Sequence, residues 1–171
     1  MSHPVSPAQR GVLEVDWTLF GELCRGLAVR VARDYQPDVV IGIAKAGVIP
    51  GAVIASILQC EFASMTVTRP REGDLPVLMG GPPRTIAGAR VLLVDETCDT
   101  GQTMKLALSE VRALQPTEVR TAVSIRTGTY LPDFHSFETE KLIILPWDRE
   151  IIVGGELVTR PDYVRWLEGA G

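Results

Sequence analysis

Side chains that build metal clusters and disulfide frameworks are scarce in this sequence, whose 171 residues include three cysteines and two histidines. Cys24, Cys60 and Cys98 share no CxxC spacing, so we expect reduced thiols rather than a zinc site or disulfides. Basic residues are not in excess either. The formal net charge is −4, which excludes the general electrostatic footprint of a nucleic-acid-binding protein. These absences predict a cytoplasmic protein that does not bind nucleic acid.

Long apolar runs are also lacking. Lys45 interrupts the best candidate for a membrane-spanning segment, and residues 1–10 have no apolar stretch of the kind that signal peptides carry. The sequence shows no internal repeat and no low-complexity segment. With 46% hydrophobic and 22% charged residues, it predicts a single globular domain over residues 1–171, without membrane contact.

Apolar segments alternate with amphipathic ones along the chain. We predict helices over 20–31, 50–58 and 104–114, and strands over 39–44, 62–68, 91–94, 119–125 and 142–145. The segment 39–44 is apolar throughout, which is typical of a parallel strand with both faces covered. The pattern predicts an α/β fold in which helices flank a mainly parallel sheet.

Glycine and proline gather in residues 69–88, between the second and third predicted strands. A loop of this length inside a compact domain is usually functional. We therefore predict a mobile loop over residues 69–88.

Polar residues follow three of the predicted strands, at 44–47, at 95–103 and from Arg126 onward. The carboxyl ends of parallel strands meet at one edge of a sheet, and such sheets bind their ligands there. We expect these three segments to lie together.

The stretch 99–103, Asp-Thr-Gly-Gln-Thr, opens the third predicted helix. A helix N-terminus attracts phosphate through its unpaired N–H groups and its dipole, while Gly101 permits close approach and Thr100 and Thr103 add hydroxyl donors. The alternative is that Asp99 and Thr100 merely cap the helix.

Two carboxylates, Asp95 and Glu96, stand immediately before this stretch. They would repel a phosphate unless they contact sugar hydroxyls or a cation on the same ligand. The combination predicts a phosphorylated sugar, and the alternative is a solvated strand end.

The stretch VLLVDETCDTGQT, residues 91–103, resembles the motif with which type I phosphoribosyltransferases bind phosphoribosyl pyrophosphate (PRPP). PDVVIGIAKAGVIPGAVIASIL, residues 37–58, is similar to the pyrophosphate loop and following helix of that family, and LIILPWDRE, residues 142–150, to the C-terminal region of its xanthine–guanine branch. Residues 69–88 match in position and loop character alone.

The resemblance implies a reaction in which a nitrogen base attacks C1 of PRPP and Mg-pyrophosphate departs. It implies a core over about residues 17–146, a small hood built from the N-terminal segment and residues 147–171, and a homodimer or higher homo-oligomer. It also implies a role for each matching residue. Asp95 and Glu96 would bind the ribose hydroxyls and are candidate Mg²⁺ ligands, and the 5-phosphate would be bound by Thr100, Gly101, Gln102 and Thr103. Pyrophosphate would be bound by Ala44, Lys45, Ala46, Gly47 and Arg69, with a cis peptide at Ala44–Lys45.

The same resemblance bears on the base. An aspartate directly before Thr-Gly, here Asp99, faces purine N7 in the 6-oxopurine branch and exchanges a proton there, so hypoxanthine, guanine or xanthine is favoured. The residues implied to contact the base are Arg126, Leu142, Ile143 and Asp148. Two of them depart from the branch, because Arg126 stands where the branch has a lysine and Leu142 where it often has an aromatic residue.

Two alternatives remain open. Some proteins of this fold sense nucleotides rather than catalyse, but they tend to lose one of the two acids or the basic loop residues, and this chain keeps both acids with Arg69, Arg71 and Arg84. Residues 42–47 also resemble a degenerate dinucleotide fingerprint of an oxidoreductase. Against it, the middle glycine is an alanine and the acidic Glu61 precedes the next strand instead of following it. A P-loop is excluded because no GxxxxGK[ST] occurs.

Overall fold

The computed structural model describes residues 11–71 and 73–168. These residues form two compact units, one of residues 22–139 and the other of 11–21 together with 140–168. The C-terminal part of the second unit starts at residue 140, whereas we predicted a hood from residue 147 onward. No helix in the described ranges is long and apolar enough to cross a membrane.

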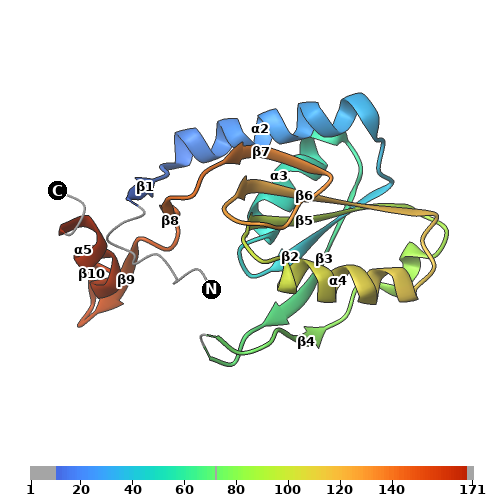
Figure 1. Ribbon diagram of the computed structural model, residues 1–171. Helices are drawn as coiled ribbons and strands as arrows, with labels where there is room; N and C mark the ends of the chain where they lie inside the picture. Colours follow the sequence, from blue (N-terminus) through green and yellow to red (C-terminus); the bar gives the residue numbers. More distant parts are fainter. Residues whose placement is uncertain (1–10, 72, 169–171) are drawn as a thin grey trace. The chain divides into compact units, whose positions relative to one another are not determined.

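A six-stranded sheet forms the centre of the larger unit (Figure 1). Its spatial order is β4-β3-β2-β5-β6-β7, and every neighbouring pair is parallel except β4 with β3. The strands are β2 (Val39–Ala44), β3 (Glu61–Thr68), β4 (Val77–Gly80), β5 (Arg90–Cys98), β6 (Glu118–Arg126) and β7 (Phe134–Glu138). The prediction of an α/β fold with a mainly parallel sheet is confirmed.

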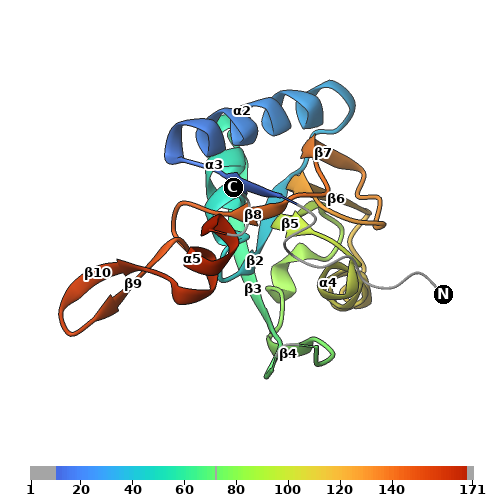
Figure 2. The same ribbon diagram turned by 60° about the vertical axis from the view of Figure 1, so that its left-hand side comes forward.

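Helices cover both faces of this sheet, as Figures 1 and 2 show. Helices α2 (Trp17–Asp34) and α3 (Val48–Leu58) pack on one face, and α4 (Gln102–Ala113) packs on the other. Alternate residues of β2 join opposite core clusters, with Val40 against α2 and α3 and Ile41 on the side of α4. The continuous apolarity of β2 thus follows from burial on both faces.

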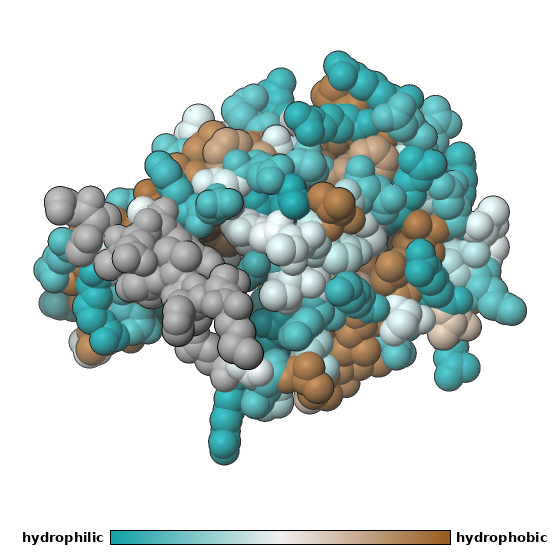
Figure 3. Space-filling model, in the orientation of Figure 1, coloured by the Kyte–Doolittle hydropathy of each residue, from teal (hydrophilic) through white to brown (hydrophobic). Residues whose placement is uncertain are grey.

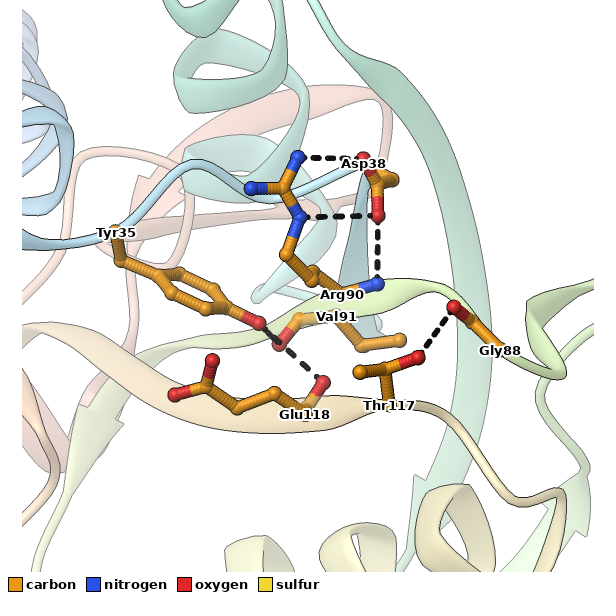
Figure 4. A network of polar contacts seen from close by, with 7 residues as sticks. All are labelled: Tyr35, Asp38, Gly88, Arg90, Val91, Thr117 and Glu118. Carbon is orange, nitrogen blue, oxygen red and sulfur yellow. Dashed lines mark hydrogen bonds and ion pairs between the residues drawn. The ribbon is translucent and has the colours of Figure 1, made fainter.

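The amino ends of three parallel strands are tied together by polar contacts (Figure 4). Arg90, at the start of β5, donates through N (2.7 Å) and Nε (3.2 Å) to one carboxylate oxygen of Asp38 and through Nη2 to the other (2.8 Å), which lowers the pKa of Asp38 to about 2. Tyr35 Oη donates to the carbonyls of Val91 (3.0 Å) and Glu118 (3.3 Å), and burial raises the pKa of Tyr35 to about 12. This network stabilises the amino ends of these strands. The carboxyl ends, where parallel sheets bind their ligands, lie on the opposite side of the sheet.

The predicted loop over 69–88 is wrong in part. Residues Val77–Gly80 form β4, which pairs antiparallel with β3, and Arg84–Ile86 form a short 3-10 helix, η1. Ile86 is 2% exposed and belongs to the core beside α4. The glycines and prolines mark turns on either side of these elements rather than one continuous loop.

The strand predicted over 142–145 is real, but it does not join the large sheet. As β8 (Leu142–Ile144) it pairs in parallel with β1 (Val12–Glu14) in the smaller unit. The outer position in the large sheet is taken by β7, whose sequence FHSFE gave no clear strand signal because polar residues interrupt it.

The smaller unit is built around aromatic and charged contacts. Trp147 packs edge-on against Phe20 with ring centroids 4.7 Å apart, and its ring centroid lies 5.6 Å from that of Trp17. Asp16 Oδ1 accepts a hydrogen bond from Leu19 N (2.7 Å), which caps the start of α2. The unit ends in a hairpin of β9 (Glu150–Val153) and β10 (Glu156–Thr159), followed by α5 (Pro161–Glu168).

The surface in Figure 3 is mainly hydrophilic, with apolar side chains in separate patches. Exposed apolar residues such as Leu75 (72%) and Met79 (68%) lie near the turn before β4 and within it. Two clusters of buried apolar side chains lie on the two faces of the sheet.

Candidate active site

Strand β5 carries two carboxylates to the carboxyl edge of the sheet. It lies between β2 and β6, and Val91 to Asp95 are all buried. Asp95 is 9% exposed, and burial followed by the neighbouring charge of Glu96 raises the pKa of its carboxyl well above the ordinary value. Asp95 Oδ1 accepts a hydrogen bond from Glu96 N (3.0 Å). A buried carboxylate beside a second carboxylate calls for a partner that offers hydroxyls or positive charge.

A cavity of about 380 Å³ opens over this strand end. It brings together residues from the three segments 43–46, 67–69 and 95–104. Its lining includes most of the predicted sugar- and phosphate-binding residues: Ala44, Lys45, Ala46, Arg69, Asp95, Glu96, Asp99, Thr100, Gly101, Gln102 and Thr103. Of the three segments that we expected to lie together, 44–47 and 95–103 both contribute to this cavity, whereas no residue from Arg126 onward is among those that line it.

The turn after β2 approaches β5 closely. The peptide between Ala44 and Lys45 is cis, as predicted. Gly47 is buried, and a Cβ added there would lie 2.6 Å from Ile43 O and 2.7 Å from Asp95 Oδ1. Gly47 does not line the cavity itself but packs directly beside the Asp95 carboxylate. Lys45 is exposed at the cavity and supplies positive charge.

Helix α4 begins at the opposite wall. Its N-cap residue is Gly101, with φ 75° and ψ 9°, and no side-chain hydrogen bond caps the helix at this residue. The alternative in which Asp99 and Thr100 serve as ordinary caps does not match this geometry. Arg69 Nη2 donates to Thr103 Oγ1 (3.4 Å) in the first turn. A helix N-terminus with an arginine beside it is suited to an anion.

Asp99 lies against the segment that follows β6. Its Oδ1 stands 1.8 Å from the place that a Cβ on Gly128 would occupy, and its carbonyl accepts a hydrogen bond from Tyr130 N (3.0 Å). We did not predict Gly128 or Tyr130 as site residues. The only signal in the sequence was the position of Gly128 just after the fourth predicted strand.

Arg126, predicted to contact the base, makes two polar contacts within the protein. Its Nε donates to Tyr130 O (2.9 Å), and its Nη1 forms an ion pair with Glu138 Oε1 (2.6 Å). Its side chain is only 15% exposed. The prediction did not anticipate these partners because both come from outside the strand that carries Arg126.

The other predicted base contacts belong to the smaller unit. Leu142 and Ile143 lie on β8, where they pair with Val12 and Leu13 of β1. Asp148 accepts hydrogen bonds from Arg160 Nη2 and from Tyr163 Oη. Burial, followed by the hydrogen bond to Asp148, raises the pKa of Tyr163.

The site offers oxygen ligands but no preformed metal cluster. Within residues 11–71 and 73–168, no three His, Cys, Asp or Glu side chains are arranged to hold a metal ion. Asp95 and Glu96 supply carboxylate oxygens, which are the donors that Mg²⁺ prefers. The residues present therefore fit a cation that is bound mainly by a phosphorylated ligand.

Comparison with known proteins identifies the family of the chain. Residues 15–155 match the phosphoribosyl transferase domain. Human hypoxanthine-guanine phosphoribosyltransferase is 39% identical over 71 residues, a match that covers 39% of this chain and 33% of that protein, so the chain aligns with about a third of the length of such relatives.

Two solved structures show the same fold. The purine phosphoribosyltransferase from Pyrococcus horikoshii has 29% identity and a TM-score of 0.75, over 85% of this chain and 99% of that one. A Neisseria gonorrhoeae protein solved with bound ppGpp has 18% identity and a TM-score of 0.67, over 94% and 96% of the two chains. Because the phosphoribosyl transferase domain matches most of this chain, the chain belongs to the type I phosphoribosyltransferase family.

Proposed function

We propose that the protein is an enzyme that transfers the 5-phosphoribosyl group of PRPP to a 6-oxopurine and releases pyrophosphate. The observation that carries this proposal is one cavity lined by the buried Asp95 and the half-buried Glu96, by an uncapped helix N-terminus and by the turn of Lys45. These three features match the three parts of PRPP: its ribose diol, its 5-phosphate and its pyrophosphate. The names of the human and Pyrococcus relatives support a purine as the acceptor.

The residues of the cavity have separate tasks in this scheme. Asp95 and Glu96 accept hydrogen bonds from the ribose hydroxyls, and the N–H groups at the start of α4 bind the 5-phosphate. Lys45 and Arg69 bind the pyrophosphate. Bound Mg²⁺ neutralises pyrophosphate charge and makes it a better leaving group.

The transfer replaces one bond at C1 of the ribose. A ring nitrogen of the purine forms the new bond to C1, while the bond from C1 to the pyrophosphate oxygen breaks and its electron pair leaves with pyrophosphate. Asp99 accepts the proton that the purine loses at N7. Such acid–base help is worth about 10²–10⁴ in rate.

The acceptor is assigned from Asp99 rather than from Arg126. Arg126 already donates to Tyr130 O and Glu138, so it is a poor candidate for recognising the 6-oxygen of the base. We propose hypoxanthine, guanine and xanthine as the acceptor class. Leu142, Ile143 and Asp148 remain proposed base contacts by resemblance to the family.

Pyrophosphate release tests this proposal. The purified chain is incubated with PRPP, Mg²⁺ and one of hypoxanthine, guanine, xanthine, adenine or orotate, and both pyrophosphate and nucleoside monophosphate are measured. We expect equal amounts of the two products with at least one 6-oxopurine, and little with adenine or orotate.

A nucleotide-sensing protein would behave differently. It would bind PRPP or a nucleotide in calorimetry and release no pyrophosphate with any of the five bases. An oxidoreductase would bind a dinucleotide instead, but the family match does not favour this alternative. Light scattering on the same sample tests the proposed homodimer or higher oligomer.

A further inference from the structure

The segment after β6 runs alongside the loop that carries Asp99. Thr127 N donates to Cys98 O (2.9 Å), Thr127 Oγ1 lies 3.3 Å from the same carbonyl, and Tyr130 N donates to Asp99 O (3.0 Å). The pairing of β5 with β6 at Cys98 and Arg126 thus continues past the strand ends. Two segments that are about thirty residues apart in the chain are joined at the proposed phosphate loop.

Two glycines allow this close approach, one in each segment. A Cβ on Gly101 would lie 2.2 Å from Tyr130 Cδ2 and 2.4 Å from its Cγ. A Cβ on Gly128 would lie 1.8 Å from Asp99 Oδ1 and 2.8 Å from Asp99 O. Each glycine therefore makes room for the larger side chain of the other segment, and the two segments interlock.

Tyr130 is also held from outside the loop. Its carbonyl accepts a hydrogen bond from Arg126 Nε (2.9 Å), and Arg126 is fixed in turn by its ion pair with Glu138 (2.6 Å). Lys105 Nζ, in the first turn of α4, lies 5.9 Å from the centroid of the Tyr130 ring. Tyr130 thus contacts Arg126 on one side and the start of α4 on the other.

We infer that Tyr130 and Arg126 are positioning residues, which hold the loop of Asp99 and Gly101 in the geometry that binds PRPP. The inference rests on the proposed function, because it assigns the loop to the 5-phosphate and Asp99 to the base. Tyr130 is not among the residues that line the cavity, so it acts through the loop and not on the substrate. Arg126 serves the same purpose from the far side of Tyr130 and does not read the base.

Tyr130→Ala is the principal test, with Tyr130→Phe as its matched control. The alanine variant removes the ring that packs on Gly101, whereas phenylalanine keeps the ring. Because small misplacements of catalytic geometry cost up to about 10²-fold, we expect kcat/KM for PRPP to fall roughly 10- to 100-fold in Tyr130→Ala. Tyr130→Phe should restore it to within about twofold of the wild type.

Arg126→Met separates positioning from base recognition. If Arg126 positions the loop, this variant weakens PRPP binding and leaves both the KM for the base and the order of preference among bases unchanged. If it recognises the base, the KM for the base rises while the Kd for PRPP, measured by calorimetry without base, stays at the wild-type value. The second result would overturn the inference.

Amide exchange in the ligand-free protein makes the test independent of catalysis. We expect the hydrogen-bonded amides of Lys105 and Thr127, which donate to Gly101 O and Cys98 O, to exchange faster in Tyr130→Ala than in the wild type and in Tyr130→Phe. Tyr130→Leu repeats the comparison with bulk retained if the alanine variant does not fold. Unchanged exchange in a folded variant would refute the positioning role. A wild type that binds no PRPP would refute the proposed function instead, while the exchange data would still decide the role of Tyr130.

Discussion

Replacement of Gly47 by alanine should damage both the fold and the proposed ligand site. Gly47 has φ −63° and ψ −14°, a conformation open to any residue, so the cost of a Cβ is entirely steric. The added atom would lie 2.6 Å from Ile43 O, 2.7 Å from Asp95 Oδ1 and 2.9 Å from Asp95 Cα. Ordinary carbon contacts are about 3.5–4.0 Å. The turn and β5 must therefore separate by about 1 Å, and two of the three atoms belong to backbone that cannot rotate away.

The expected loss follows from this overpacking. Overfilling a packed interior costs about 1–3 kcal/mol. For a domain of this size each kcal/mol lowers Tm by roughly 2–4 °C, so we expect a fall of about 2–12 °C in Gly47→Ala. The affinity for PRPP should fall as well, because the shift moves Asp95 and the turn of Lys45 apart. Scanning calorimetry and titration calorimetry measure the two effects.

Gly21→Ala is the matched control. Gly21 lies inside α2, and no heavy atom stands within 4 Å of an added Cβ. Alanine is the better helix former by about 0.5–1 kcal/mol, so this variant should be slightly more stable than the wild type and bind PRPP equally well. A Gly47→Ala protein with the wild-type Tm and the wild-type Kd for PRPP would refute the steric argument.

Three further predictions concern the cation, the loop and pH. Because Mg²⁺ neutralises pyrophosphate, calorimetry should show that EDTA weakens PRPP binding; equal affinity in EDTA would contradict the role of the cation. The amides of Arg69, Arg71, Gly73 and Leu75 should exchange more slowly when PRPP and Mg²⁺ are bound, whereas the amide of the buried Ile86 should be protected throughout. Protection of the same four amides in the empty protein would argue against a mobile loop. Tyr35→Phe should lower the free energy of unfolding by about 1–3 kcal/mol at pH 7, since it removes the donor for two carbonyls. The pKa of Tyr35 is raised to about 12 in the folded protein, so the contribution of this side chain to the free energy of unfolding is lost as the pH rises from about 10 to 12. The difference in the free energy of unfolding between the wild type and Tyr35→Phe should therefore narrow over this range, and chemical denaturation at each pH measures it.

The regular part of the fold was predictable from local patterns. The segment 39–44 is apolar at every position because α3 and α4 cover its two faces, and that pattern is visible in the sequence alone. The two acids and the Thr-Gly loop follow a strand and open a helix, so the topology of a parallel sheet alone brings them to the edge that binds ligands.

Features that depend on pairing between distant segments were not predictable. Strand β4 is four residues long and is stabilised by β3, and β7 alternates too weakly to be recognised by itself. Arg126 was assigned to the base because its position after a strand matched the family. Its partners, Tyr130 O and Glu138, are fixed by the path of the chain after β6, which no local pattern encodes.

The turnover of Asp99→Asn tests the central claim most directly, because only purine chemistry needs a carboxylate at this position. Asparagine keeps the shape that packs against Gly128, so the loop and its affinity for PRPP should be preserved. It cannot accept the proton from N7, so the turnover on the best 6-oxopurine should fall by roughly 10²–10⁴ while the Kd for PRPP stays at the wild-type value. An Asp99→Asn protein with wild-type turnover would contradict the account and leave a PRPP site with no assigned purine chemistry.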